Sequence, residues 1–77
     1  MQAYRTPDNL KVTPAAARVS AGLTQEEAAG RLRIAKSTLI DWELGRRSPT
    51  VTQAVEMSTL YGRPLNSIRL AFTVTFL

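Results

Sequence analysis

Apolar residues recur at helical spacing through the middle of this 77-residue chain. Ala28 and Leu32 share one face of a predicted helix, and a small side chain on that face favours a close neighbour. Leu39 and Trp42 repeat three residues apart on a second predicted helix. The stretch Thr24–Leu44 therefore predicts two short helices joined by a tight turn.

Capping signals place the ends of these helices and of their neighbours. A threonine followed by proline, or by a glutamate or glutamine three residues later, predicts a helix start. The threonine, glutamate and glutamine side chains accept hydrogen bonds from free backbone N–H groups, and proline has no backbone N–H to leave unpaired. Glycine tolerates the left-handed backbone that ends many helices. The predicted starts are Thr13, Thr24 and Thr50, and the predicted stops are Gly22, Gly45 and Gly62. A short fifth helix is predicted after Pro64.

The apolar residues of the outer helices predict the sides that face the core. They are Val12, Ala16, Val19 and Leu23 for the first helix, Val51, Ala54, Val55, Ser58 and Tyr61 for the fourth, and Leu65 and Ile68 for the fifth. The pattern predicts a mainly α-helical fold with five helices.

The two ends of the chain break the helical pattern, which divides it into an arm (1–11), a helical domain (12–69) and a tail (70–77). The arm holds a Pro-Asp-Asn turn signature and predicts irregular structure. The tail alternates threonines with apolar residues, as a β-strand does, at Phe72, Val74 and Phe76. Because an unpaired apolar strand tends to associate, we expect the tail to pair with a second copy or with the arm. A truncated larger domain is the alternative.

Eight residues of the central stretch form a recognisable set: Gln25, Ala28, Ala29, Leu32, Ile34, Leu39, Trp42 and Glu43. They resemble the helix-turn-helix of phage-repressor and Cro-type (XRE family) domains, at the family's first-helix glutamine, core apolar positions and late glutamate. The resemblance extends from Val12 to Arg69, about three quarters of the chain. It implies a mainly α, five-helix, lambda-repressor-like DNA-binding domain, to which the tail can add a short C-terminal β-strand.

Two positions depart from the pattern of that family. Arg33 stands where the turn usually has glycine and normally needs a left-handed backbone, so we expect either a tolerated strain of about 1 kcal/mol or a slightly altered turn. Ala35 cannot cap the second helix, and Lys36 puts a positive charge at the positive end of its dipole. The missing cap and the unfavourable charge would both be offset if this helix end met a DNA phosphate or a guanine edge. Departures from such local sequence rules are typical of functional sites.

Charge is concentrated near the same helices. Ten basic and six acidic residues give a net charge of +4, and Arg31–Arg47 holds five basic residues against two acidic ones. Such a cluster is expected of a phosphate-binding face, although an ordinary solvated surface explains the charge counts equally well. The chain has no cysteine or histidine, which argues against disulfides and the commonest metal sites. It has no apolar run of membrane-spanning length.

The resemblance implies roles for individual residues. Base-reading positions at the start of the recognition helix are Lys36, Ser37, Thr38, Ile40 and Asp41. Lysine can donate to guanine, and the aspartate can accept from cytosine or repel phosphate. Expected phosphate contacts are Gln25, Arg33, Arg46, Arg47 and Ser48. A salt bridge between Arg18 and Glu43 is implied, with two unrelated surface charges as the alternative.

These expectations favour a sequence-specific regulator of transcription, namely a phage-type repressor that binds a palindromic operator in double-stranded DNA as a homodimer. We expect it in the cytoplasm of a bacterial or phage-infected cell, associated with the nucleoid, without cofactor, metal or membrane. The alternative is an antitoxin or interaction module bound by a protein partner, through the C-terminal tail. Catalysis is not expected, because capping and solvation explain the carboxylates. Trp42 is expected to be a core anchor and not a platform for single-stranded bases.

Overall fold

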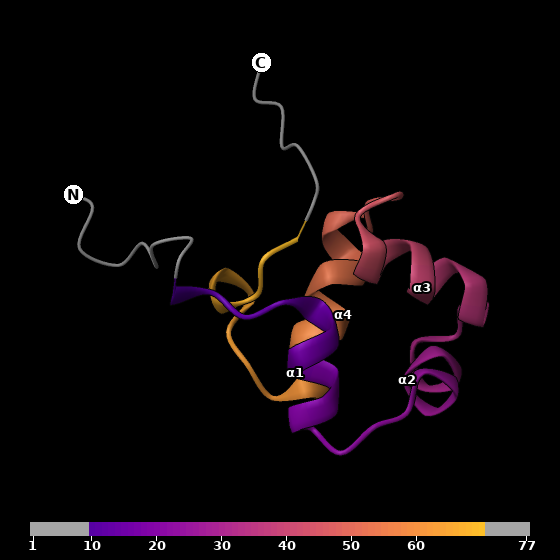
Figure 1. Cartoon of the computed structure of the whole chain (residues 1–77), viewed down its shortest axis with the longest axis horizontal. Helices are drawn as coiled ribbons and strands as arrows, with labels where there is room; N and C mark the ends of the chain where they lie inside the picture. The colour runs from indigo at the N-terminus through magenta and orange to yellow at the C-terminus, as the bar shows by residue number, and fades with distance from the viewer. Residues whose placement is uncertain (1–9, 71–77) are drawn as a thin grey trace.

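The computed structural model describes residues 10–70 as four α-helices followed by one turn of 3-10 helix. These elements are α1 (Pro14–Ser20), α2 (Gln25–Leu32), α3 (Lys36–Leu44), α4 (Val51–Tyr61) and η2 (Leu65–Ser67). Figure 1 shows α1 in front of α4, with α2 and α3 to one side. The second helix packs against both α3 and α4, and α1 touches α3 and α4. The mainly α-helical prediction is confirmed.

The prediction of a fifth α-helix is wrong. After Pro64 the chain forms only one turn of 3-10 helix, η2. Ser67 and Ile68 donate to carbonyls three residues back, at 2.9 and 3.2 Å, and Ile68 then takes an extended backbone. That extended residue forms a parallel bridge with Val12. Val12 N donates to Ser67 O at 2.9 Å and Arg69 N donates to Val12 O at 2.8 Å, so the two ends of the described chain lie side by side.

The predicted caps are present. Thr24 Oγ1 accepts from Glu27 N at 3.0 Å while Glu27 Oε1 accepts from Thr24 N at 2.9 Å, and Thr50 and Gln53 repeat this box on α4. Thr13 Oγ1 accepts from Ala16 N at 3.1 Å, as expected at the start of α1. Gly45 ends α3 with a left-handed backbone. These local signals place the helices without help from tertiary structure.

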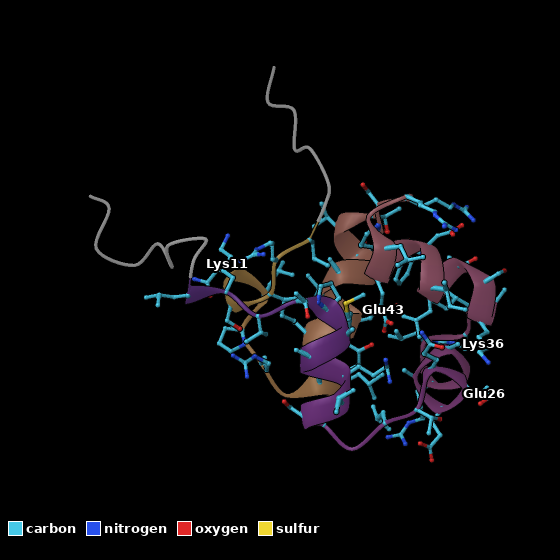
Figure 2. The ribbon with its side chains drawn as sticks, viewed as in Figure 1. Lys11, Glu26, Lys36 and Glu43 are labelled. Carbon is cyan, nitrogen blue, oxygen red and sulfur yellow. The ribbon has the colours of Figure 1, made fainter. Side chains whose placement is uncertain are left out.

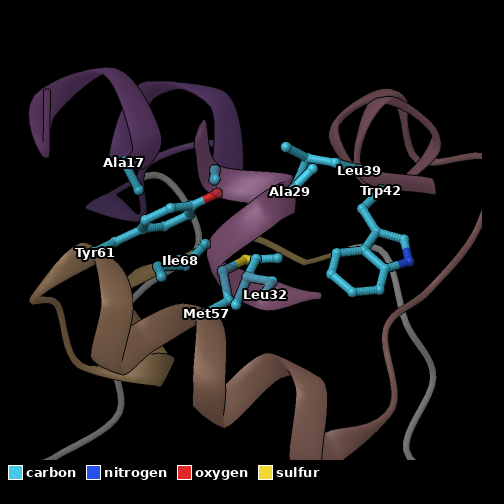
Figure 3. Packing of buried hydrophobic residues seen from close by; sticks show 9 residues of the cluster. Ala17, Ala29, Leu32, Leu39, Trp42, Met57, Tyr61 and Ile68 are labelled. Carbon is cyan, nitrogen blue, oxygen red and sulfur yellow. The ribbon is translucent and has the colours of Figure 1, made fainter. Parts of the chain in front are cut away.

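The core lies between the four helices and consists of small and large apolar side chains. Its members are Ala17, Ala28, Ala29, Leu32, Leu39, Trp42, Met57, Tyr61 and Ile68. Figure 3 shows Met57 beside Leu32, and Tyr61 beside Ala17. The buried alanines allow α1 and α2 to approach their neighbours closely, as the sequence predicted for α2.

The predicted inward faces of α1 and α4 need correction. On α1 the buried residues are Pro14 and Ala17, whereas Val19 is 64% exposed, because residues two positions apart on a helix point to nearly opposite sides and α1 turns the side of Ala17 toward the core. On α4 the buried residues are Ala54, Met57 and Tyr61, and the two valines that were expected inside, Val51 and Val55, are 57% and 47% exposed. Each helix has two adjacent apolar faces, and packing selects the one that fits.

Predictions for the arm up to residue 9, and for Phe72, Val74 and Phe76 in the tail, lie outside the described residues. Within the described part, no helix is both long enough and apolar enough to cross a membrane.

Candidate nucleic-acid interface

The turn between α2 and α3 fixes the angle at which the recognition helix leaves the core. Arg33 has φ 58° and ψ 45°, a left-handed backbone, so of the two expectations for this position the structure has the strained turn and not the altered one. The turn closes because Ile34 N donates to Ala29 O at 3.0 Å. Ile34 then packs against the core cluster, so the strained residue is held by contacts on both sides.

Two buried anchors decide which side of α3 faces outward. Leu39 is fully buried and Trp42 is 3% exposed, so both side chains point into the core. This burial confirms that Trp42 is a core anchor, because a buried indole offers no face to a stacked base. Lys36 and Ser37 are exposed in the first turn of α3. The remaining expected base readers, Thr38, Ile40 and Asp41, are half-buried. One side of this nine-residue helix is therefore accessible to a groove of DNA.

The N-terminus of α3 has no side-chain cap, as predicted from Ala35. Its first free backbone N–H groups form a weakly positive end that attracts anions. The sequence predicted an unfavourable charge from Lys36 at this end. In the structure, a carboxylate meets that charge: Lys36 Nζ lies 3.7 Å from Oε2 of Glu26, in the first turn of α2. Figure 2 shows the two side chains together at one edge of the domain.

A polar cluster behind α3 ties three helices together. The structure contains the ion pair expected between Arg18 and Glu43, with Nε donating to Oε2 at 2.6 Å. The guanidinium also donates to Leu23 O at 2.9 Å. Gln25 Nε2 donates to the other oxygen of Glu43 at 3.1 Å. This bond uses one of the two N–H donors of the side-chain amide of Gln25, which was expected as a phosphate contact.

Burial and charge shift the acid–base properties of this cluster. The hydrogen bond to Glu43 raises the pKa of Arg18 above its usual value. Burial, and secondly the nearby Glu43, raise the pKa of Tyr61 from 10.0 to about 12. Among the described residues, the Tyr61 hydroxyl is one of two buried side-chain polar atoms without a hydrogen-bond partner; Arg63 Nε is the other. The cluster is charged and bonded on the side of Arg18 but unsatisfied at Tyr61.

The loop after α3 presents basic side chains beyond the other end of the recognition helix. Arg46 N donates to Asp41 O at 2.8 Å, which folds the loop back onto α3. Arg46, Arg47 and Ser48 are exposed, and the buried Pro49 anchors the loop after them. Arg46 Nη1 also lies 3.7 Å from Asp41 Oδ1. The expected phosphate contacts of this loop are thus brought next to the expected base reader Asp41.

One residue at this face, Glu26, was not expected from the sequence. It stands ten positions before Lys36, and only the turn between the helices brings the two together. The one sequence signal was an acidic residue in the first turn of a helix, and that has a sufficient explanation in the helix dipole.

A shallow groove of about 500 Å³ lies between the last turn of α2 and α4. Its walls are formed by Arg31, Leu32, Arg33, Val55, Glu56, Thr59 and Leu60. Arg33, expected as a phosphate contact, therefore lines a surface shared with α4. In residues 10–70 no group of three acidic side chains is placed to hold a metal ion.

Comparison with known proteins bears on this geometry. A family model described as helix-turn-helix matches residues 15–68, which is more than two thirds of the chain. Comparisons with curated proteins and with solved structures found no match. The matched span runs from α1 through the bridge residue Ile68 and includes every helix of the interface. The chain therefore belongs to the Cro- and phage-repressor-type (XRE) helix-turn-helix family and is a DNA-binding transcription regulator of that type.

Proposed function

We propose that this regulator is a phage-type repressor that reads a specific operator by inserting α3 into the DNA major groove. The observation that carries the proposal is the accessible side of α3, set above the buried Leu39 and Trp42. Lys36 and Ser37 lie in the first turn of α3. There a lysine can donate to guanine O6 or N7, and a serine hydroxyl can donate to or accept from a base. Such a protein acts in the cytoplasm, at the nucleoid of a bacterial or phage-infected cell.

The remaining side chains of α3 extend the reading surface by one turn. Ile40 offers an apolar contact to a thymine methyl group, with Thr38 at its flank. Asp41 accepts from a cytosine amino group and keeps phosphates at a distance. Specificity then depends on a few contacts from each copy.

Phosphate contacts on both sides of α3 set its depth and register in the groove. Gln25 and Arg33 belong to α2 and its turn, and the loop after α3 supplies Arg46, Arg47 and Ser48. These contacts carry affinity and salt dependence but little sequence information.

A homodimer on a palindromic site completes the proposal. One short recognition helix reads few base pairs, and helix-turn-helix proteins gain affinity by placing two copies about 34 Å apart. We assign the pairing to the tail, on the sequence alternation at Phe72, Val74 and Phe76. Light scattering tests this assignment with a chain that ends at Arg69: the shortened chain should be monomeric, and an unaltered dimer would refute the role of the tail.

Binding-site selection with the purified full chain tests the function itself. We expect enrichment of one duplex motif with twofold symmetry, whose half-sites are centred about 10 base pairs apart. Lack of enrichment over the starting pool would refute sequence-specific binding. An asymmetric motif would refute the dimer on a palindrome while leaving specific recognition in place.

A second candidate function is an antitoxin or interaction module that a protein partner binds. The groove between α2 and α4 and the exposed Val51 and Val55 favour it, because an exposed surface with apolar side chains is typical of a site where a protein partner binds. The tail offers a second surface for such a partner. This function would be supported if tail deletion abolished partner binding while the operator affinity per dimer stayed the same.

A further inference from the structure

Ion pairs stand at both ends of the accessible side of α3. At the first end, Lys36 Nζ lies 3.7 Å from Glu26 Oε2, and the two side chains are 48% and 76% exposed. At the second end, Arg46 Nη1 lies 3.7 Å from Asp41 Oδ1, with exposures of 69% and 28%. In each pair the cation is a proposed DNA contact. Both cations therefore have a carboxylate partner before DNA arrives.

The pair at Lys36 contributes little to folding. Exposed ion pairs at such distances have small net energies, since water and salt screen both charges. Glu26 is also not needed to cap α2, because Thr24 and Glu27 form that capping box. A carboxylate in the first turn of α2 also suits the helix dipole, and from this position Glu26 lies beside the ammonium group of Lys36.

A carboxylate beside Lys36 distinguishes two kinds of acceptor on DNA. An ammonium group has three donors, so Lys36 can keep Glu26 as one partner and donate to guanine O6 or N7 with another. The guanine edge is uncharged and does not repel the carboxylate. A phosphate is anionic, so the same lysine cannot approach it without bringing Glu26 close to a like charge.

We propose that Glu26 is a specificity-determining residue, which directs Lys36 toward base edges and away from phosphates. This inference rests on the proposed function of α3. Glu26 lowers the affinity for DNA without the operator motif, where no guanine is held at the position of Lys36 and the lysine contacts phosphates instead. It changes the affinity for the operator much less. Arg46 and Asp41 also form a pair between a proposed DNA-contacting cation and a carboxylate. Because Asp41 is itself a proposed base reader, a substitution at Glu26 tests the effect of the carboxylate more directly.

The test compares Glu26→Gln with Glu56→Gln in the full-length chain. Glu56 is an exposed carboxylate on α4 beside the groove, so its substitution removes the same charge at a different place. Fluorescence anisotropy measures binding to the selected duplex and to a scrambled duplex, over a series from low to moderate salt. The fluorescence of the buried Trp42 checks that each variant is folded.

We expect Glu26→Gln to tighten binding to the scrambled duplex by about threefold at low salt, relative to Glu56→Gln. The affinity for the selected duplex should change by less than about 1.5-fold, so the ratio of the affinities for the selected and scrambled duplexes should fall. On the scrambled duplex the salt slope should steepen by up to about 0.9, the value for one additional phosphate contact. In a Lys36→Gln background, the effect of Glu26→Gln should disappear.

Three results would overturn the inference in distinguishable ways. If the wild-type chain fails to prefer its selected duplex, the proposed function fails and the inference with it. If the wild-type chain shows the preference but the two glutamine variants behave alike, the role of Glu26 is refuted and the function stands. If Glu26→Gln has its full effect in the Lys36→Gln background, Glu26 repels phosphates directly and does not act through Lys36.

Discussion

Breaking the ion pair between Arg18 and Glu43 by removing one partner should destabilise this small domain by an unusually large amount. The two side chains are only 11% and 6% exposed, so water screens them poorly. Replacing Arg18 with methionine keeps most of the apolar stem but removes the guanidinium, with its hydrogen bonds to Glu43 and to Leu23 O. Glu43 is then left buried, with Gln25 as its remaining partner in this cluster.

The expected loss follows from that burial. Breaking a buried pair by removing one partner costs about 3–5 kcal/mol, and we take about 3 kcal/mol because Gln25 still donates to the carboxylate. A chain of 77 residues has a total stability of about 4–12 kcal/mol. Arg18→Met therefore removes between about a quarter and three quarters of it. Glu43→Gln should cost only about 1–2 kcal/mol, since Arg18 keeps its bond to Leu23 O and gains an amide acceptor.

Urea denaturation followed by tryptophan fluorescence measures these losses. Trp42 is the single tryptophan and is 3% exposed, so its emission reports the packing of α3. The double variant Arg18→Met/Glu43→Gln should lose clearly less than the sum of the two single variants, because it leaves no unpaired charge. A loss below about 1 kcal/mol for Arg18→Met, or strict additivity, would refute the claim that this pair is effectively buried.

Further predictions concern three single residues, Tyr61, Arg33 and Arg46. Tyr61→Phe should leave the unfolding free energy unchanged or raise it by about 1 kcal/mol, because it deletes an unsatisfied hydroxyl; a loss above that size in urea denaturation would contradict the reasoning. Since the folded pKa of Tyr61 is about 12 and its ordinary value is 10.0, wild-type stability should fall as the pH rises from 10 to 12, and Tyr61→Phe should lose that part of the slope. Arg33→Gly should raise the thermal midpoint, because relief of the left-handed strain is worth about 1 kcal/mol, and an unchanged midpoint would argue against strain at this turn. Arg46→Ala should weaken binding to all duplexes and flatten the salt slope by about 0.9, whereas a selective loss at one base pair would show that it reads bases.

Local chemistry made much of this fold predictable. The capping boxes at Thr24 and Thr50 act between residues three positions apart, so they are visible in the sequence and present in the structure. At Arg33 the sequence left strain and an altered turn open, and the structure has the left-handed backbone. These signals, together with the anchors Leu39 and Trp42, were enough to place the recognition helix.

Tertiary contacts decided what the sequence left open. The helix α4 has two apolar faces. The face with Met57 packs into the core because it fits the other core side chains better. In place of the predicted fifth helix, Ile68 forms a β-bridge with Val12, which lies more than fifty residues earlier in the sequence. Glu26 meets Lys36 only after the turn has formed, so this part of the interface had no signature in the sequence.

The central claim is that the N-terminal end of α3 reads base pairs. The chain has two lysines, and Figure 2 shows them on opposite sides of the domain, with Lys36 at the proposed interface and Lys11 far from it. The decisive measurement is the ratio of affinities for the selected and scrambled duplexes in Lys36→Ala and Lys11→Ala. The account predicts that Lys36→Ala lowers this ratio by about 5- to 100-fold, the effect of one good base contact, while Lys11→Ala leaves it unchanged. An unchanged ratio in Lys36→Ala, or an equal fall in both variants, would contradict the account.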